Sequence, residues 1–228
     1  MDGPEFDDLW VVVPVYNEAP VLERTLAELT ACFPHVCVVD DASTDHSGLI
    51  AQALFDQGVR LVSQPINLGQ GAALQTGFEY VLGDPEMARV VTFDADGQHS
   101  VSDAVRLARD LGGGFDVVLG SRMLGRAPQM GRLKRLVLRV AVAYTNLTVG
   151  LKLTDTHNGL RAMNRSAVAA MRLTQPGMAH ATEILERIKA AKLRHTEVGV
   201  EIHYSDYSRS KGQSLLNSVN ILVDLLVR

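Results

Sequence analysis

The chain has 228 residues, of which 46% are hydrophobic and 21% charged, a composition typical of globular proteins. At this mass, folding buries roughly 72% of the surface of the unfolded chain, so a full core needs no disulfide or structural metal. The formal net charge of −4 gives no basic field for nucleic acid, and the two cysteines belong to no zinc-binding cluster.

The amino terminus is acidic and lacks the apolar core of a signal peptide. No segment reaches the run of about 20 apolar residues that a membrane-spanning helix requires. We therefore expect a cytoplasmic protein with reduced thiols. Such a protein can still lie peripherally on the inner face of a membrane.

Apolar runs and amphipathic segments alternate along the first half of the chain. Strands are predicted at 9–13, 36–39, 59–62, 90–93 and 115–119, and helices at 20–31, after residue 45, at 71–81 and at 101–111. This alternation predicts an α/β fold with a mostly parallel central sheet flanked by helices.

The second half is less regular. Helices are predicted at 132–147, 181–192 and 215–227, with a short strand near residue 160 and an edge strand at 196–204. The sequence shows no repeat and no long linker, so we expect a single domain over residues 1–228.

Two acidic residues follow the strand predicted at 90–93. Because side chains alternate along an extended chain, Asp94 and Asp96 point the same way at the carboxyl end of that strand. In open α/β sheets this edge binds ligands. Paired carboxylates suit a hard cation such as Mg²⁺ or Mn²⁺, which in turn suits a phosphate.

Other polar loops are predicted at the same edge of the sheet, because parallel strands end together there. They are Pro14-Val15-Tyr16-Asn17-Glu18, Asp40-Asp41 and Gly120-Ser121-Arg122. Each loop alone is explained by a strand end or a helix cap. Together with the paired carboxylates they indicate a binding site.

These loops resemble those of the family 2 inverting glycosyltransferases with the GT-A fold, and most closely the dolichyl- or polyprenyl-phosphate sugar synthases. The resemblance covers about residues 10–216 and rests on Pro-Val-Tyr-Asn-Glu, Val-Asp-Asp-x-Ser-x-Asp, Asn67-Leu68-Gly69-Gln70-Gly71, Asp-Ala-Asp-Gly-Gln-His and Gly-Ser-Arg. One departure is Ala42, where glycine is usual. The resemblance implies a nucleotide-binding half at about 9–122 and an acceptor half at about 123–228.

The resemblance also implies the donor site. Pro14, Tyr16 and Glu18 would line the nucleotide pocket, and Asp41 would accept a hydrogen bond from the N–H that both uracil and guanine carry, so GDP- and UDP-linked sugars both remain open. The cation would be held by Asp94, Asp96 and Gln98, with Asp96 and Arg122 as the catalytic residues. Arg209 and Lys211 resemble the basic Arg-x-x-Gly-x-Ser loop that closes over the diphosphate.

The candidate residues for binding the acceptor are Arg135, Asn158 and Glu183. A phosphate monoester is already ionised and needs cations, whereas a hydroxyl needs a general base such as Glu183 or Asp155. The basic and apolar segment 132–139 is typical of an interfacial helix, and so favours polyprenyl phosphate at a membrane surface. A soluble hydroxyl acceptor, a non-catalytic nucleotide-sugar-binding module and a homo-oligomer built on the last helix remain open.

Overall fold

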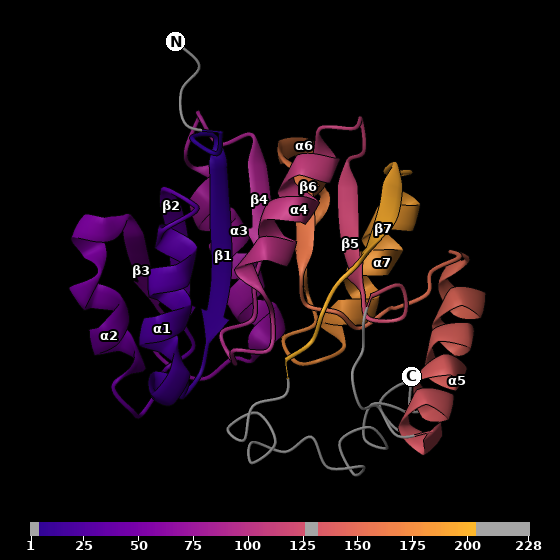
Figure 1. Ribbon diagram of the computed structural model, residues 1–228, viewed down its shortest axis with the longest axis horizontal. Helices are drawn as coiled ribbons and strands as arrows, with labels where there is room; N and C mark the ends of the chain where they lie inside the picture. Colours follow the sequence, from indigo (N-terminus) through magenta and orange to yellow (C-terminus); the bar gives the residue numbers. More distant parts are fainter. Residues whose placement is uncertain (1–4, 126–131, 204–228) are drawn as a thin grey trace.

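A seven-stranded sheet forms the centre of the protein (Figure 1). The structure is a computed structural model and describes residues 5–125 and 132–203, without the side chains of 132–137. The strands are β1 (Leu9–Val15), β2 (His35–Asp40), β3 (Val59–Ser63), β4 (Arg89–Thr92), β5 (Val117–Ser121), β6 (Arg161–Asn164) and β7 (His195–Gly199), in the order β3-β2-β1-β4-β6-β5-β7. Within this part of the chain only β6 runs antiparallel to its neighbours.

Helices cover both faces of the sheet, giving three layers (Figure 1). One face packs against α1 (Ala19–Thr30), α2 (Ser47–Ala53) and α4 (Val101–Leu111), and the other against α3 (Gln70–Leu82), α6 (Arg165–Ala170) and α7 (His180–Ala190). A short 3₁₀ helix, η1, spans Phe55–Gln57, and α5 (Arg132–Val149) lies against α7. None of the described helices is long and apolar enough to cross a bilayer.

Strand β1 shows why the sequence forms this sheet. Val11 and Val13 pack in the core beneath α1, whereas Trp10 and Val12 pack in the core beneath α3. All seven residues of β1 are buried. A strand covered on both faces reads as a continuous apolar run, which is the pattern from which this strand is predicted.

The predicted α/β fold with a mostly parallel sheet is confirmed. Helix α6 is not predicted, and the short strand expected near residue 160 is the antiparallel β6. Because β6 begins at the edge where the parallel strands end, it brings the segment 155–160 to that edge. The predicted helix at 215–227 lies outside the described residues.

Helix α3 approaches the sheet closely at Gly77, where a Cβ would lie 2.4 Å from Cγ1 of Val12. We expect Gly77→Ala to lower the free energy of unfolding by about 1–2 kcal/mol, because overpacking outweighs the higher helix propensity of alanine. Urea denaturation measures the change. Gly177→Ala is the control, since a Cβ there meets nothing within 4 Å.

The Gly77 effect should depend on Val12. In the Val12→Ala background the obstructing methyl is absent, so Gly77→Ala should destabilise the protein less than it does in the wild type. Equal effects in both backgrounds would contradict the steric explanation.

Candidate active site

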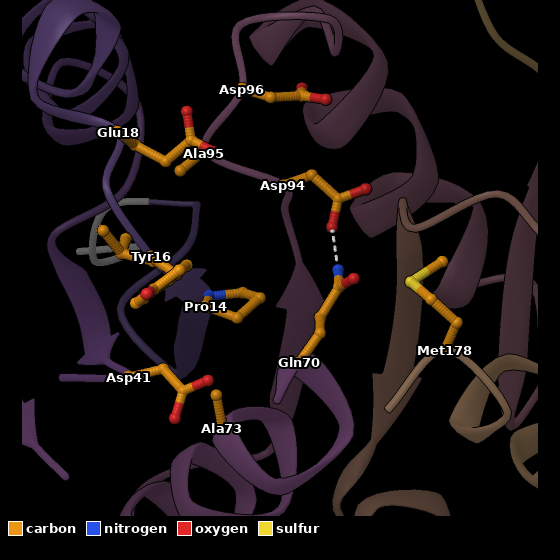
Figure 2. A pocket seen from close by; sticks show the side chains of 11 residues that line it. Pro14, Tyr16, Glu18, Asp41, Gln70, Ala73, Asp94, Ala95, Asp96 and Met178 are labelled. Atoms are coloured by element: carbon orange, nitrogen blue, oxygen red, sulfur yellow. Dashed lines mark hydrogen bonds between the residues drawn. The ribbon is translucent and has the colours of Figure 1, made fainter. Parts of the chain in front are cut away.

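A cavity of about 280 Å³ opens where β1, β2 and β4 end (Figure 2). It is lined by Pro14, Val15, Tyr16, Glu18, Asp41, Gln70, Ala73, Asp94, Ala95, Asp96 and Met178. Six of these side chains are predicted site residues: Pro14, Tyr16, Glu18, Asp41, Asp94 and Asp96. The structure therefore brings most of the predicted donor site together in one cavity.

The loop after β1 is held by the loop after β2. Asn17 has a left-handed backbone, with φ of 55°, and its N–H donates to Oγ of Ser43 at 3.0 Å. Its side-chain oxygen accepts from the N–H of Thr44 at 2.8 Å. The N–H of Glu18 donates to Oγ of Ser47 at 2.9 Å. These contacts fix the backbone around the predicted nucleotide-binding residues.

Asp41 organises the turn that leads into α3. Its two carboxylate oxygens accept from the N–H groups of Leu68 and Gly69, each at 2.7 Å, and the residue is only 3% exposed. A carboxylate has further lone pairs, so its predicted contact with a base N–H stays a prediction. The neighbouring Ala42 has φ of 58°, which is the conformation that favours the glycine usual at this position.

Asp94 is held on both of its carboxylate oxygens. Nε2 of Gln70 donates to Oδ1 at 2.8 Å, and Nε2 of His99 lies 3.1 Å from Oδ2 (Figure 2 shows the Gln70 contact). Burial alone would raise the pKa of Asp94, but the hydrogen bond from His99 and the charge of the buried Arg161 lower it below its usual value. Asp94 is therefore a fixed anion at the floor of the cavity.

Asp96 is in a different electrostatic state. Burial and the negative charge of Asp94 raise the pKa of Asp96 to about 6. Gln98 supports this carboxylate, because its backbone N–H donates to Oδ1 at 3.0 Å and its side-chain amide donates to Oδ2. Gln98 therefore stands beside Asp96, and its direct role as a metal ligand stays a prediction.

The carboxylate oxygens at this cavity suit a metal ion that also binds a substrate. Within the described part of the chain, no group of three or more His, Cys, Asp or Glu side chains could hold a metal by itself. Asp94 and Asp96 are two hard oxygen ligands on one cavity, and their repulsion is relieved by a positive charge. Mg²⁺ and Mn²⁺ suit such a site, because they keep positions for waters and substrate phosphates.

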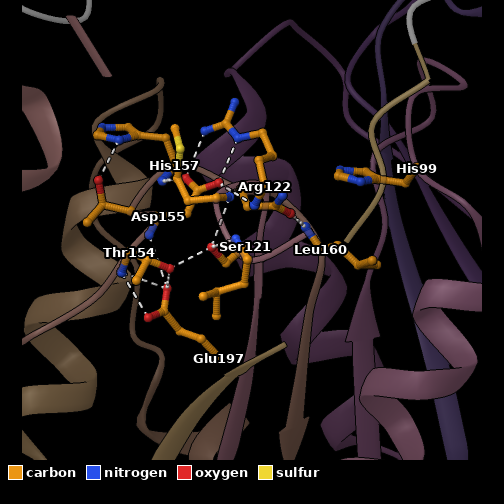
Figure 3. Close-up of polar contacts among 12 residues, drawn as sticks. His99, Ser121, Arg122, Thr154, Asp155, His157, Leu160 and Glu197 are labelled. Atoms are coloured by element: carbon orange, nitrogen blue, oxygen red, sulfur yellow. Dashed lines mark hydrogen bonds and ion pairs between the residues drawn. The ribbon is translucent and has the colours of Figure 1, made fainter. Parts of the chain in front are cut away.

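Arg122, which follows β5, is paired with Asp155 (Figure 3). Its Nε lies 2.6 Å from Oδ2 of Asp155 and its Nη2 lies 2.8 Å from Oδ1, a bidentate pair. Burial would raise the pKa of Asp155, but the Arg122 charge and hydrogen bonds lower it. Glu197 of β7 holds the same loop by accepting from the N–H groups of Thr154 and Asp155.

Glu183 fixes a loop at the edge of the cavity. Its carboxylate accepts from the N–H and Oγ1–H of Thr174, from the N–H of Gln175 and from Arg187. Burial would raise the pKa of Glu183, but these hydrogen bonds lower it. The loop that it holds carries Met178 into the cavity wall.

The remaining predicted residues lie elsewhere. Asn158 is buried and accepts from the N–H of Leu160 at 2.9 Å, and neither it nor Glu183 nor Arg122 lines the cavity as described. Arg135 belongs to α5, at a position whose side chain is not described. Arg209 and Lys211 lie outside the described residues.

Sequence reasoning missed four residues around Asp94: Gln70, His99, Arg161 and Met178. The first two stand within the motifs quoted above, so a signal for them was present. Arg161 follows Asn158-Gly159-Leu160, and its buried position depends on the antiparallel β6. Met178 reaches the cavity through a loop that no sequence pattern marks.

The glycosyl transferase family 2 profile matches residues 10–172. The chain therefore belongs to glycosyl transferase family 2, and it is a glycosyltransferase.

Two curated relatives are named for polyprenyl-phosphate acceptors. The UDP-N-acetylglucosamine–dolichyl-phosphate N-acetylglucosaminyltransferase of Methanococcus voltae is 27% identical, over 96% of this chain and 95% of that protein. The undecaprenyl-phosphate 4-deoxy-4-formamido-L-arabinose transferase of Shewanella sediminis is 30% identical, over 96% of this chain and 66% of that protein.

A solved structure confirms the GT-A-like fold. Glucosyl-3-phosphoglycerate synthase from Mycobacterium tuberculosis, in complex with Mn²⁺, UDP and glucosyl-3-phosphoglycerate, superposes with a TM-score of 0.65 and 21% identity. The match covers 95% of this chain and 79% of that one.

Gly159 leaves room for Asp94, since a Cβ on Gly159 would lie 1.9 Å from Oδ2 of Asp94. We expect Gly159→Ala to weaken binding of Mn²⁺ with UDP by about tenfold or more, because Asp94 must turn away from its hydrogen-bond donors. Isothermal titration calorimetry measures the affinity. Unchanged binding would contradict a need for this orientation of Asp94.

The buried Arg122–Asp155 pair should stabilise the fold. We expect Asp155→Asn to lower the free energy of unfolding at pH 7 by about 3 kcal/mol, because it leaves a partly buried guanidinium without its counter-charge. Urea denaturation measures the change. The exposed Glu28, which pairs with Arg24 at 3.7 Å, provides the control Glu28→Gln with little expected change.

The same pair predicts a pH dependence. The pKa of Asp155 is lowered on folding, so its stabilisation is complete above the ordinary carboxyl pKa of 3.8 and is lost as the pH falls through the lower folded value. The difference between wild type and Asp155→Asn should therefore shrink below pH 3.8. A difference that grows on acidification would contradict this sign.

Proposed function

We propose that this protein transfers one sugar from a nucleoside-diphosphate sugar to polyprenyl phosphate at the cytoplasmic face of a membrane, with Mg²⁺ or Mn²⁺. The observation that carries the proposal is the joint position of Asp94 and Asp96 on the cavity that Tyr16 and Asp41 also line. A cavity with a metal-binding end and an aromatic, carboxylate-bearing end suits a nucleoside diphosphate.

Electrostatics supports the cation. A carboxylate and a phosphate charge about 4 Å apart repel by roughly 4 kcal/mol at an effective dielectric constant of about 20. Asp94 and Asp96 would therefore repel a diphosphate in the absence of a counter-charge. A bound cation would stabilise the charge on the leaving nucleoside diphosphate, and these two residues would hold it.

The state of the acids supports a phosphate acceptor. A hydroxyl acceptor needs a general base, and Glu183 and Asp155 are the acids proposed for it. The charge and hydrogen bonds of Arg122 lower the pKa of Asp155, and hydrogen bonds lower the pKa of Glu183. Because both carboxylates are weak bases that already accept hydrogen bonds, they are poorly suited to remove a proton from a hydroxyl. An acceptor that is already ionised needs no such base.

Helix α5 supports a membrane location. Its second half exposes Val140, Tyr144 and Leu147, which recur at the spacing of one helix face. Its first half carries Arg132, Lys134, Arg135 and Arg139 in the sequence. Apolar and basic residues on one helix suit the interface between acyl chains and anionic head groups.

The names of the relatives support the acceptor class, since both are named for a polyprenyl phosphate and they differ in the sugar. In this proposal Arg122 and Arg135 attract the acceptor phosphate and Asn158 shapes the wall beside it. Arg209 and Lys211 close over the diphosphate of the donor.

A lipid-extraction assay tests the proposal. The purified protein is mixed with Mn²⁺, a short polyprenyl phosphate and each of a panel of labelled GDP- and UDP-sugars, and label extracted into organic solvent is counted. We expect extractable label with one donor, its loss on chelation of the metal, and a fall on the order of 100-fold or more for Asp96→Asn.

The matched control is Asp56→Asn, because Asp56 lies exposed in η1. It should retain wild-type transfer. Metal-dependent release of nucleotide without extractable label would overturn the lipid acceptor and select a soluble hydroxyl acceptor. Nucleotide binding without turnover of any donor would overturn the proposed transfer.

A further inference from the structure

Gln70 projects from a rigid point in the chain. It is the first residue of α3, and the turn before it is held by the two hydrogen bonds from Leu68 and Gly69 to Asp41. On its other side, the N–H of Gly71 donates to the carbonyl of Pro176 at 2.7 Å. The start of this side chain is therefore fixed from both directions.

Chemistry also fixes the orientation of the Gln70 amide. Nε2 of Gln70 donates to Oδ1 of Asp94 at 2.8 Å, so the NH₂ group of the amide faces the carboxylate. A carboxylate oxygen accepts such a donor, which leaves the amide oxygen on the other side. The amide oxygen Oε1 is turned toward the Met178 side of the cavity (Figure 2), and no hydrogen bond to it occurs among the described residues.

The cavity has two ends. Pro14, Tyr16 and Asp41 lie together at one end, while Asp94 and Asp96 lie at the other (Figure 2). Gln70 reaches Asp94 across the cavity from the side that faces Met178.

In the proposed function, a nucleotide with its base at Asp41 and its diphosphate near the two carboxylates would leave the corner beside Gln70 and Met178 for the transferred sugar. This corner combines two kinds of contact. An amide oxygen that can only accept selects a group that donates, and a sugar hydroxyl is such a group. A flexible, polarisable thioether packs well against the C–H face of a sugar ring. Small-molecule sites commonly pair an apolar wall with a few placed polar groups.

We propose that Gln70 is a specificity-determining residue whose Oε1 accepts a hydrogen bond from one hydroxyl of the donor sugar. The inference rests on the proposed function, because it assumes a nucleotide-sugar donor. It narrows the donor to sugars that carry a hydroxyl at the position facing Gln70, and it disfavours a sugar that is deoxygenated there.

Calorimetry with the whole chain and Mn²⁺ tests this. Affinities are measured for UDP-glucose, UDP-N-acetylglucosamine and GDP-mannose, and for UDP and GDP alone. In Gln70→Met, which keeps length and removes the amide, the change in nucleoside diphosphate affinity measures the loss of the contact with Asp94. The affinity for the preferred nucleotide sugar should fall roughly three- to tenfold more than the nucleoside diphosphate affinity does, as for one neutral hydrogen bond.

Deoxy analogues of the preferred nucleotide sugar identify the hydroxyl. One analogue should bind wild type more weakly than its parent does, yet lose no more affinity in Gln70→Met than the nucleoside diphosphate loses, since the hydroxyl contact is then absent from both complexes. A merely structural role for Gln70 would not single out one hydroxyl. Gln52→Met is the matched control, because Gln52 is exposed on α2.

Two results would overturn this inference and leave the proposed function standing. One is an equal loss of nucleoside diphosphate and nucleotide-sugar affinity in Gln70→Met. The other is an unchanged preference among the deoxy analogues. A wild-type protein that binds no nucleoside diphosphate with Mn²⁺ would instead overturn the proposed function, and this inference with it.

Discussion

An ionised carboxylate held in a partly buried position is the constraint on which the site depends. Burial opposes the charge of Asp94, so the protein must supply partners that favour it. Gln70 and His99 hold one oxygen each, and the buried Arg161 adds positive charge beneath. Burial and this nearby anion raise the pKa of Asp96, so the pair favours a positive counter-charge.

The antiparallel β6 is the structural device that makes this arrangement possible. A further parallel strand would enter at the far edge of the sheet, whereas β6 enters at the site and carries Arg161 with it. Gly159, just before β6, leaves the space that the Asp94 carboxylate fills. The same loop supplies Asp155, which fixes Arg122. The contacts that support Asp94 and those that support Arg122 therefore both depend on the one antiparallel strand.

The cavity at the ends of β1, β2 and β4 could be predicted from the sequence because local rules determine it. Alternation along a strand pairs Asp94 with Asp96, and parallel strands bring Tyr16 and Asp41 to the same edge. The partners of Arg122 and Glu183 could not be predicted, because they come from loops 33 and 9 residues away in sequence whose paths depend on tertiary packing. Sequence reasoning treats both residues as ligand contacts, and the structure shows that each also holds a loop.

The two ends of the cavity are built differently, and this bears on how specificity can vary. The end proposed for the cation and the nucleotide consists of residues that directly follow strands, so its geometry is tied to the sheet. Opposite it, Met178 stands on a loop outside the sheet, which Glu183 holds by its carboxylate. A substitution at Met178 would reshape that side of the cavity without altering the strand end that carries Asp94 and Asp96. Relatives named for one acceptor class and for different sugars are what such a division of the cavity would produce.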